Sequence, residues 1–276
     1  GPDKIKFWSS PTGEIPVTAV FARLSIIDVS ANGDQPFFSS DGQSVFVFNG
    51  ELYNHKELRS YLTAKGEKFD GTSDSEVFFK GLLNEGDDFL LKCRGMWAYC
   101  LWDRQTEVLR FGRDRFGEKP LYFYKPKSGG IMFASESKAL VPFLDKKLKH
   151  ERISHFFRNP FDYEHTENTI YKHIRRVPHS HTGTYAGGEI QFRRWWCTLD
   201  HLVKVPMNYS DQVERFRELF LDSVKIRLVQ DVQISAALSG GLDSSSVICA
   251  AHYLYGGKLS ELSEKQKITE AYCSHY

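Results

Sequence analysis

The sequence predicts an α+β domain over residues 1–198, a linker at residues 199–209 and the beginning of an α/β domain over residues 210–276. Short segments rich in β-branched and aromatic residues, each bounded by turn residues, fill most of the first part. A polar run that contains Pro206 then separates them from the rest of the chain. After it come a helical pattern, a short apolar strand, a Gly-rich loop and a second helical pattern, which is an order of elements typical of α/β domains.

Composition and charge restrict the class of partner. The 36 basic and 35 acidic side chains nearly cancel, so there is no electrostatic reason to expect nucleic acid or a membrane surface as a partner. No apolar run approaches the roughly 20 residues that span a bilayer. The five cysteines are scattered and have neither CxxC nor Cys/His ligand spacing, which argues against disulfides and a zinc site. We therefore expect a cytoplasmic protein that acts on small molecules.

Five strands and two helices are expected in the first domain. The first helix begins after Asn54 as N-cap and is stopped by Gly66. The second begins after Ser73, which forms a capping box with Glu76, and it ends before Gly86. The strands are expected at residues 45–48, 96–102, 108–111, 121–124 and 131–134.

The second domain is expected to begin with a helix that Ser210 caps and that continues to about Val229, because apolar residues recur there at three- or four-residue spacing. An apolar strand at residues 232–238 follows, and the next helix is expected from Ser246. Only about 30 residues remain after the loop, too few for a parallel sheet covered on both faces. We therefore expect only the start of this domain.

The loop between that strand and the next helix has the composition of a phosphate site. Gly240 and Gly241 let backbone N–H groups point at one centre, and serine hydroxyls surround them. Asp243 fits if Mg²⁺ lies between its carboxylate and the phosphates, because a hard cation takes oxygen ligands from both. The following helix would direct the partial positive charge of its N-terminus at the same point. A tight turn without a ligand is the structural alternative.

The order Ser, Gly, Gly, Asp, Ser in this loop resembles the SGGxDS signature of the PP-loop ATP pyrophosphatases, which cleave ATP between its α and β phosphates. No Lys follows the glycines, so the loop differs from the GxxxxGK[ST] loop of kinases and GTPases. The resemblance implies ATP as a substrate, Mg²⁺ held by Asp243, and adenylation of an acceptor. The residues implied in ATP binding are Leu238, Ser239, Gly240, Gly241, Leu242, Asp243, Ser244 and Ser245.

A second series of motifs lies in the first domain. Asn49-Gly50 alone would be interpreted as a hairpin turn at the end of an apolar strand. It belongs, however, to a series formed by residues 23–28, 49–54, 73–76 and 112–122. In order and spacing this series resembles the glutaminase domain of glutamine-dependent asparagine synthetases, and together with the SGGLDSS loop the resemblance covers most of the chain. It implies an αββα sandwich of the N-terminal-nucleophile hydrolase type, followed by a PP-loop domain of the adenine nucleotide α-hydrolase type.

The resemblance implies a complete pocket for glutamine, a zwitterion with a neutral amide. Arg23 would grip the α-carboxylate, while Asp74 and Glu51 would hold the α-ammonium. The Asn49 carboxamide and the Gly50 backbone N–H would form the oxyanion hole. For each charged residue a surface ion pair is the structural alternative, and Arg113 with Asp114 is expected to be mainly a structural pair. The residues implied in glutamine binding are Arg23, Leu24, Ile26, Ile27, Asn49, Gly50, Glu51 and Asp74.

One part of the family's machinery is missing from the sequence. The family uses an N-terminal cysteine as nucleophile, with its own α-amine as base, and no cysteine precedes Cys93 here. Residues 1–3 resemble the HRGPD motif that follows that cysteine, so we expect the sequence to be truncated upstream; a remnant of protease cleavage at Gly1-Pro2 is the alternative. The polar tail after Gly256 could not be aligned with the family. We expect this chain alone to catalyse little.

The leading hypothesis is a glutamine-hydrolysing asparagine synthetase. Glutamine would give ammonia, and aspartate would be activated as aspartyl-AMP with release of pyrophosphate and then amidated. A related amidotransferase or β-lactam synthetase acting on another carboxylic acid is one alternative. A non-catalytic module that only binds glutamine is another. The family resemblance also allows a homodimer.

Overall fold

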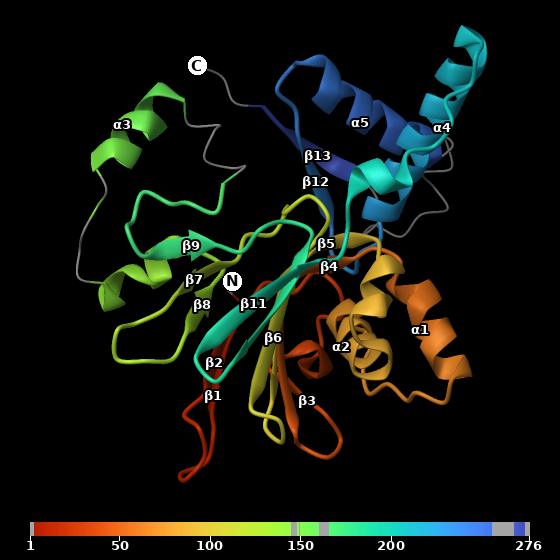
Figure 1. Cartoon of the computed structure of the whole chain (residues 1–276). Coiled ribbons are helices and arrows are strands. Elements are labelled where there is room, and N and C mark those ends of the chain that lie inside the picture. The colour runs from red at the N-terminus through yellow and green to blue at the C-terminus, as the bar shows by residue number, and fades with distance from the viewer. Residues whose placement is uncertain (1–2, 145–147, 149, 160–165, 256–267, 274–276) are drawn as a thin grey trace.

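The structure, a computed structural model, describes residues 3–144, 148, 150–159, 166–255 and 268–273. Its centre is an antiparallel sheet with the strand order β11-β10-β6-β5-β4-β3 (Figure 1). The strands of this sheet are β3 (Phe37–Phe38), β4 (Ser44–Leu52), β5 (Gly95–Asp103), β6 (Val108–Arg113), β10 (His181–Ala186) and β11 (Glu189–Arg194).

Two smaller sheets accompany the central one. The first has the order β8-β7-β9, and the second is the hairpin β1-β2. Their strands are β7 (Tyr122–Tyr124), β8 (Met132–Ala134), β9 (Ile174–Arg176), β1 (Lys4–Ser9) and β2 (Thr18–Arg23). Helix α3 (His150–Arg158) is fastened to the segment before β9, because Arg152 Nη1 donates to the carbonyl of Thr169 at 2.9 Å.

Alternation along the strands divides the core of the first domain into two layers. Even-numbered residues of β4 and odd-numbered residues of β5, such as Phe46 and Trp97, pack against the helices α1 (His55–Ala64) and α2 (Asp74–Glu85). On the opposite face Ala98 packs with residues of the smaller sheet, such as Phe123. The result is a helix–sheet–sheet sandwich, and the predicted α+β class is confirmed.

The two helices begin where the sequence predicts, but their caps differ from the prediction. Ser73 Oγ accepts a hydrogen bond from the N–H of Glu76 at 3.2 Å, as a capping box requires. The Glu76 carboxylate, however, accepts from the N–H groups of Asp70 and Gly71 instead of from Ser73. Asn54 makes no side-chain cap, because its carboxamide instead joins two backbone groups of residues 92 and 94.

The second part of the chain forms a parallel β–α–β unit after a long helix. Its elements are α4 (Tyr209–Arg227), β12 (Ile234–Ala237), α5 (Leu242–Leu254) and β13 (Ile268–Tyr272). Strands β12 and β13 pair in parallel, and a small core forms around Val224, Ala250 and Ala251. In Figure 1 this part, coloured cyan to blue, stands above α1.

Three details of this part differ from the expectation. The N-cap position of α4 is Asn208, not Ser210, and its side chain makes no cap hydrogen bond; helix α5 begins at Leu242 inside the Gly-rich loop, not at Ser246. Strand β13 was not predicted, because its segment carries no clear alternation. In the described part of the chain, no helix combines the length and apolarity needed to cross a membrane.

Candidate functional site

The Asn49-Gly50 pair lies inside a strand. Strand β4 continues to Leu52, with Asn49 opposite Ala98 and Gly50 opposite Trp97 of β5. The hairpin turn, which is the alternative from local sequence, is therefore wrong. Glycine is required at position 50 because a Cβ atom there would lie 2.3 Å from the carbonyl oxygen of Met96 and 2.7 Å from Cα of Trp97.

The backbone groups on the outer edge of β4 are satisfied by side chains. The N–H of Phe48 donates to Gln35 Oε1 at 2.6 Å, and Gln35 Nε2 donates back to the carbonyl of Phe48 at 3.0 Å. The N–H of Leu52 donates to Asp74 Oδ2 at 2.7 Å. Because strand hydrogen bonds alternate with a period of two residues, the N–H of residue 50 also points away from β5.

The hydrogen bonds of Trp97, the residue opposite Gly50, also indicate that the Gly50 N–H points away from β5. The N–H of Trp97 donates to Asp114 Oδ2 at 3.0 Å, and its carbonyl accepts from the N–H of Asp114 at 2.8 Å. Trp97 therefore directs both backbone groups away from Gly50. Among the described residues, no group accepts from the Gly50 N–H and no partner binds the half-buried Asn49 carboxamide. Adjacent positions of β4 thus hold two donors that no group in the described part of the chain uses.

Two carboxylates lie beside these donors. Asp74 is buried at the first turn of α2, where it accepts hydrogen bonds from the N–H groups of Leu52 and Ser75. Burial raises the pKa of Asp74 to about 6, and the nearby charge of Glu51 acts in the same direction. Burial also raises the pKa of the Glu51 carboxyl, while Lys119 opposes that shift. The pair forms a partly desolvated acidic site, which favours a cation as ligand.

The segment that carries Lys119 is held by Asp114. Asp114 Oδ1 accepts from the N–H groups of Phe116 and Glu118, and Oδ2 accepts from the N–H of Lys119, each at 3.0 Å. Arg113 holds the same segment, since its Nε donates to the carbonyl of Lys119 at 2.8 Å. Among the described residues, no ion pair joins Arg113 to Asp114. Each of the two side chains holds the segment through its own hydrogen bonds.

Arg23 is buried, and most of the hydrogen-bond donors of its guanidinium group already have protein acceptors. Its Nη1 donates to the carbonyl of Ser30 at 2.6 Å and to Asp34 Oδ1 at 2.7 Å, and its Nη2 donates to the carbonyl of Asp28. Gly33 leaves room for the guanidinium, because a Cβ there would lie 2.2 Å from Nη2. These contacts use three of the five guanidinium donors, and the described residues supply no hydrogen-bond acceptor for the other two.

Three further residues of the predicted glutamine site belong to the loop that follows β2. Leu24 is exposed, Ile26 is half-buried and Ile27 is buried. Asp28, which is not among the predicted site residues, holds this loop through hydrogen bonds to Thr72 and Ser30. Its Oδ2 accepts from the N–H of Thr72 at 2.7 Å, two residues before Asp74. The signal was present, since an Asp followed two residues later by Ser is typical of a side-chain-capped turn.

The Gly-rich loop after β12 has the geometry of an anion site. Gly240 has φ +79°, a left-handed conformation that glycine adopts without strain. Ser239 Oγ and Ser244 Oγ lie 3.0 Å apart and close the loop. Helix α5 begins directly after Gly241, and no side chain caps it, so its first N–H groups face outward.

The Asp243 side chain is exposed in the first turn of α5. A carboxylate beside an anion site can share a hard cation with a phosphate, so this position fits Mg²⁺. The described residues contain no group of three or more His, Cys, Asp or Glu side chains arranged to hold a metal without such a ligand. Phosphate oxygens would therefore have to complete the coordination.

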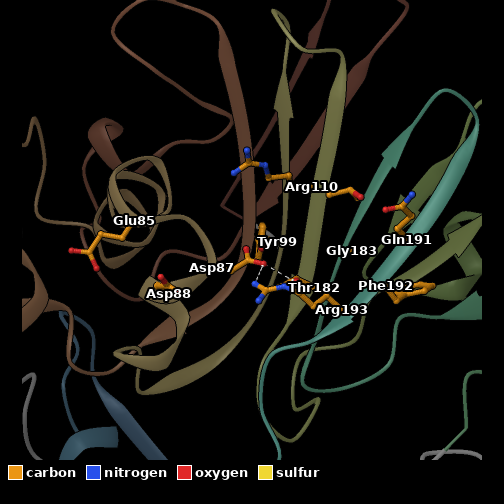
Figure 2. A pocket seen from close by; sticks show the side chains of 11 residues that line it. Glu85, Asp87, Asp88, Tyr99, Arg110, Thr182, Gly183, Gln191, Phe192 and Arg193 are labelled. Atoms are coloured by element: carbon orange, nitrogen blue, oxygen red, sulfur yellow. Dashed lines mark hydrogen bonds and ion pairs between the residues drawn. The ribbon is translucent and has the colours of Figure 1, made fainter.

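A separate pocket of about 520 Å³ lies over β6, β10 and β11 (Figure 2). Asp87 lines this pocket, and its carboxylate accepts a hydrogen bond from Thr182 Oγ1 at 2.9 Å and pairs with Arg193. None of the residues that line this pocket belongs to the predicted glutamine or ATP sites. Within its lining Asp87 pairs with Arg193, whereas Glu85 pairs with Lys65 and Lys92 outside it, and we assign no function to this pocket.

Comparison with protein families gives two matches that divide the chain as the structure does. A glutamine amidotransferase domain matches residues 1–196, and an asparagine synthase domain matches residues 215–263. The chain belongs to the glutamine amidotransferase family, which confirms the fold class expected for its first domain. The second match indicates that an asparagine synthase domain begins in the second part of the chain.

The chain is also similar to individual proteins, two of which match most of its length. Asparagine synthetase [glutamine-hydrolyzing] 3 of Bacillus subtilis (strain 168) is 34% identical over 266 residues, which are 94% of this chain and 42% of that protein. Amidase chyE of Penicillium rubens is 35% identical over 228 residues, 82% of this chain and 33% of that protein. The chain thus spans less than half the length of these relatives. A solved structure, glutamine phosphoribosylpyrophosphate amidotransferase from B. subtilis complexed with ADP and GMP, is 17% identical with a TM-score of 0.46, and the match covers 92% of this chain and 50% of that one.

Proposed function

We propose that the protein is a glutamine-hydrolysing asparagine synthetase in which the first domain releases ammonia from glutamine. One observation carries the proposal: β4 offers an outward N–H at Gly50 and an unused carboxamide at Asn49 beside the buried carboxylate of Asp74. Two donors with no protein acceptor suit the oxyanion of a tetrahedral intermediate. An acidic pair next to them suits the α-ammonium of an amino acid.

In the proposed reaction, glutamine is held at both ends of its backbone. The ammonium lies at Asp74 and Glu51, and the carboxylate meets the two remaining donors of Arg23. The side-chain amide then reaches the donors of Asn49 and Gly50. These contacts orient the amide carbon for attack and stabilise the negative charge that develops on its oxygen.

Two thiols of the first domain do not fit the role of nucleophile. Cys93 is buried and Cys100 is half-buried, and burial raises the pKa of both, that of Cys100 to about 12. A thiol with such a raised pKa is almost entirely protonated near neutral pH. The acyl step therefore requires a nucleophile other than these two, which agrees with the N-terminal cysteine of the family.

For the second domain we propose ATP as substrate, with its phosphates at the loop formed by residues 238–245. The N–H groups at the start of α5 and the hydroxyls of Ser239 and Ser244 would bind phosphate oxygens. Asp243 would hold Mg²⁺, which would supply charge neutralisation to the phosphates. The acceptor is aspartate in this proposal, and the product is its amide.

A different acceptor acid is the second candidate. The identity to amidase chyE, 35%, is as high as that to the asparagine synthetases. The first domain would then work in the same way, and only the acid that is adenylated would change. A glutamine-binding module without catalysis fits less well, since it would have no use for the donors at residues 49 and 50. The cytoplasm as compartment and a homodimer remain parts of the proposal.

Two measurements test the proposed function. In the full-length protein, aspartate together with ATP should give AMP and pyrophosphate, and aspartate-dependent formation of ADP would contradict the adenylation step. In this chain, calorimetric titration should detect glutamine binding that Asp74→Ala removes. Asn49→Ala should keep most of that binding, because its carboxamide serves the intermediate more than the ground state. Replacement of aspartate by a panel of carboxylic acids separates the two candidate acceptors.

A further inference from the structure

The connection between α4 and β12 contacts the loop after β2 directly. The N–H of Asp231 donates to the carbonyl of Ile26 at 3.0 Å. In return, Asp231 Oδ2 accepts from the N–H of Asp28 at 2.8 Å. This pair of hydrogen bonds joins residues more than 200 positions apart in sequence and connects the two domains.

Asp28 is held from several sides at once. It has φ +54°, a left-handed conformation that is uncommon for residues other than glycine and persists where surrounding contacts fix it. Its carbonyl accepts from Arg23, and its Oδ1 accepts from the N–H of Ser30 at 3.0 Å. Asp231 binds the one backbone donor of Asp28, so it fixes the left-handed turn from the other domain.

The same residue leads to the acidic pair. Asp28 Oδ2 accepts from the N–H of Thr72, and the next residue, Ser73, is the N-cap of α2. Asp74 follows at the first position of that helix. A shift of Asp28 would therefore move two predicted glutamine contacts together, the guanidinium of Arg23 and the carboxylate of Asp74.

Two other contacts between the described residues of the two parts lie away from this loop. Arg94 pairs with Asp222 of α4, where both side chains are about half exposed. The guanidinium carbon of Arg227 lies 4.9 Å from the centroid of the Tyr53 ring. Asp231 alone of these residues bonds to the segment that precedes Ser30. It also lies three residues before β12, the strand that ends at the phosphate loop.

We propose that Asp231 is a positioning residue for glutamine: it acts from the synthetase domain through Asp28 to set the loop of residues 24–28, an assignment that rests on the proposed glutamine site. Asp231 does not touch glutamine itself. Its effect is to hold Arg23 and the start of α2 in the arrangement that binds the ligand, so its loss weakens glutamine binding without changing the phosphate loop.

The test compares three variants of this chain. Asp231→Leu removes the acceptor for the Asp28 N–H, while Asp231→Asn keeps an acceptor oxygen without the charge. Asp222→Ala is the matched control, because it removes another contact between the domains that is remote from the loop. Glutamine and ATP affinities are measured by calorimetry, and folding is checked by thermal unfolding.

We expect Asp231→Leu to weaken glutamine binding about fivefold to tenfold, as the loss of one hydrogen bond predicts, with ATP binding unchanged. Asp231→Asn should restore most of the affinity, and Asp222→Ala should bind glutamine as the parent chain does. Equal losses in Asp231→Leu and Asp222→Ala would overturn the proposal, because they would indicate a general effect of domain contact.

Hydrogen exchange of the Asp28 amide separates this inference from the proposed function. In the parent chain this amide should be protected, and Asp231→Leu should lose that protection whether or not glutamine binds. Unchanged protection would refute the positioning role. Absence of glutamine binding in the parent chain, with protection that depends on Asp231, would instead contradict the proposed function and leave the loop contact established.

Discussion

Asp74 combines a buried position with a role that requires charge. Its carboxyl has its pKa raised to about 6, chiefly by burial and in part by Glu51, while the N–H groups of Leu52 and Ser75 favour the charged form. Above that pH the carboxylate attracts an ammonium group, and below it the group binds a proton and loses that attraction.

We therefore expect glutamine affinity to be constant above about pH 7 and to fall about tenfold for each pH unit below about 6. The raised pKa of Glu51 acts in the same direction. Calorimetric titration of glutamine between pH 5 and pH 8 measures this. Asp74→Asn should bind weakly and keep only the part of the pH dependence that Glu51 contributes, and a flat profile in the parent chain would contradict the assignment of Asp74.

Gly50 is constrained by the neighbouring strand. A Cβ atom there would meet backbone atoms of Met96 and Trp97, and backbone in a central strand cannot move aside as a flexible side chain can. Gly50→Ala should lower the free energy of unfolding by about 1–3 kcal/mol. Urea unfolding monitored by tryptophan fluorescence measures the loss. An unchanged midpoint would mean that β4 and β5 are farther apart at this point than described.

At the scale of elements, the start of α2 shows how one residue pattern can produce a different set of contacts. Ser73 and Glu76 have the spacing of a capping box, yet the Glu76 carboxylate binds the N–H groups of Asp70 and Gly71. Both oxygens of Glu76 are thus used to fold the preceding loop back onto the helix. That loop also carries Thr72, which binds Asp28.

The two residues should therefore differ in their contribution to stability. Ser73→Ala removes one cap hydrogen bond and should cost about 1 kcal/mol. Glu76→Ala removes two hydrogen bonds from the N–H groups of Asp70 and Gly71 to a charged acceptor and should cost about 2–4 kcal/mol. Urea unfolding of the two variants tests the order, with Ser60→Ala at an exposed position of α1 as control. A larger loss for Ser73→Ala would restore the capping-box interpretation.

At the scale of the whole molecule, the fold determines which thiols are accessible. Cys249 is exposed on α5, whereas Cys93 is buried and Cys100 is half-buried in the central sheet, and burial raises the pKa of both. We expect iodoacetamide at pH 8 to modify Cys249 in the native chain and Cys93 and Cys100 only after unfolding. Mass spectrometry of tryptic peptides measures this. Modification of Cys100 in the native state would contradict the packing of the central sheet.

The sequence by itself determined the class of the first domain, the two helices with their N-caps, five of its strands and the Gly-rich loop of the second domain. These are local properties, because periodicity, turn residues and capping depend on neighbours in the chain. The resemblance to a family also followed from ordered motifs, and the family matches confirm it. The boundaries of α4 and α5 and strand β13 were not obtained, since tertiary pairing decides them.

Only the tertiary structure decided which hydrogen-bond donors of the predicted site have acceptors within the described protein and which do not. Asn49-Gly50 is a turn signal in local sequence, and pairing with β5 makes it part of a strand, with the N–H of Gly50 directed outward. Arg23 looks like a free cation in the sequence, whereas Ser30, Asp34 and Asp28 take three of its donors. Hydrogen-bond partners distant in sequence are invisible to a local pattern. The contact of Asp231 with the loop after β2 could be seen only once the chain was folded.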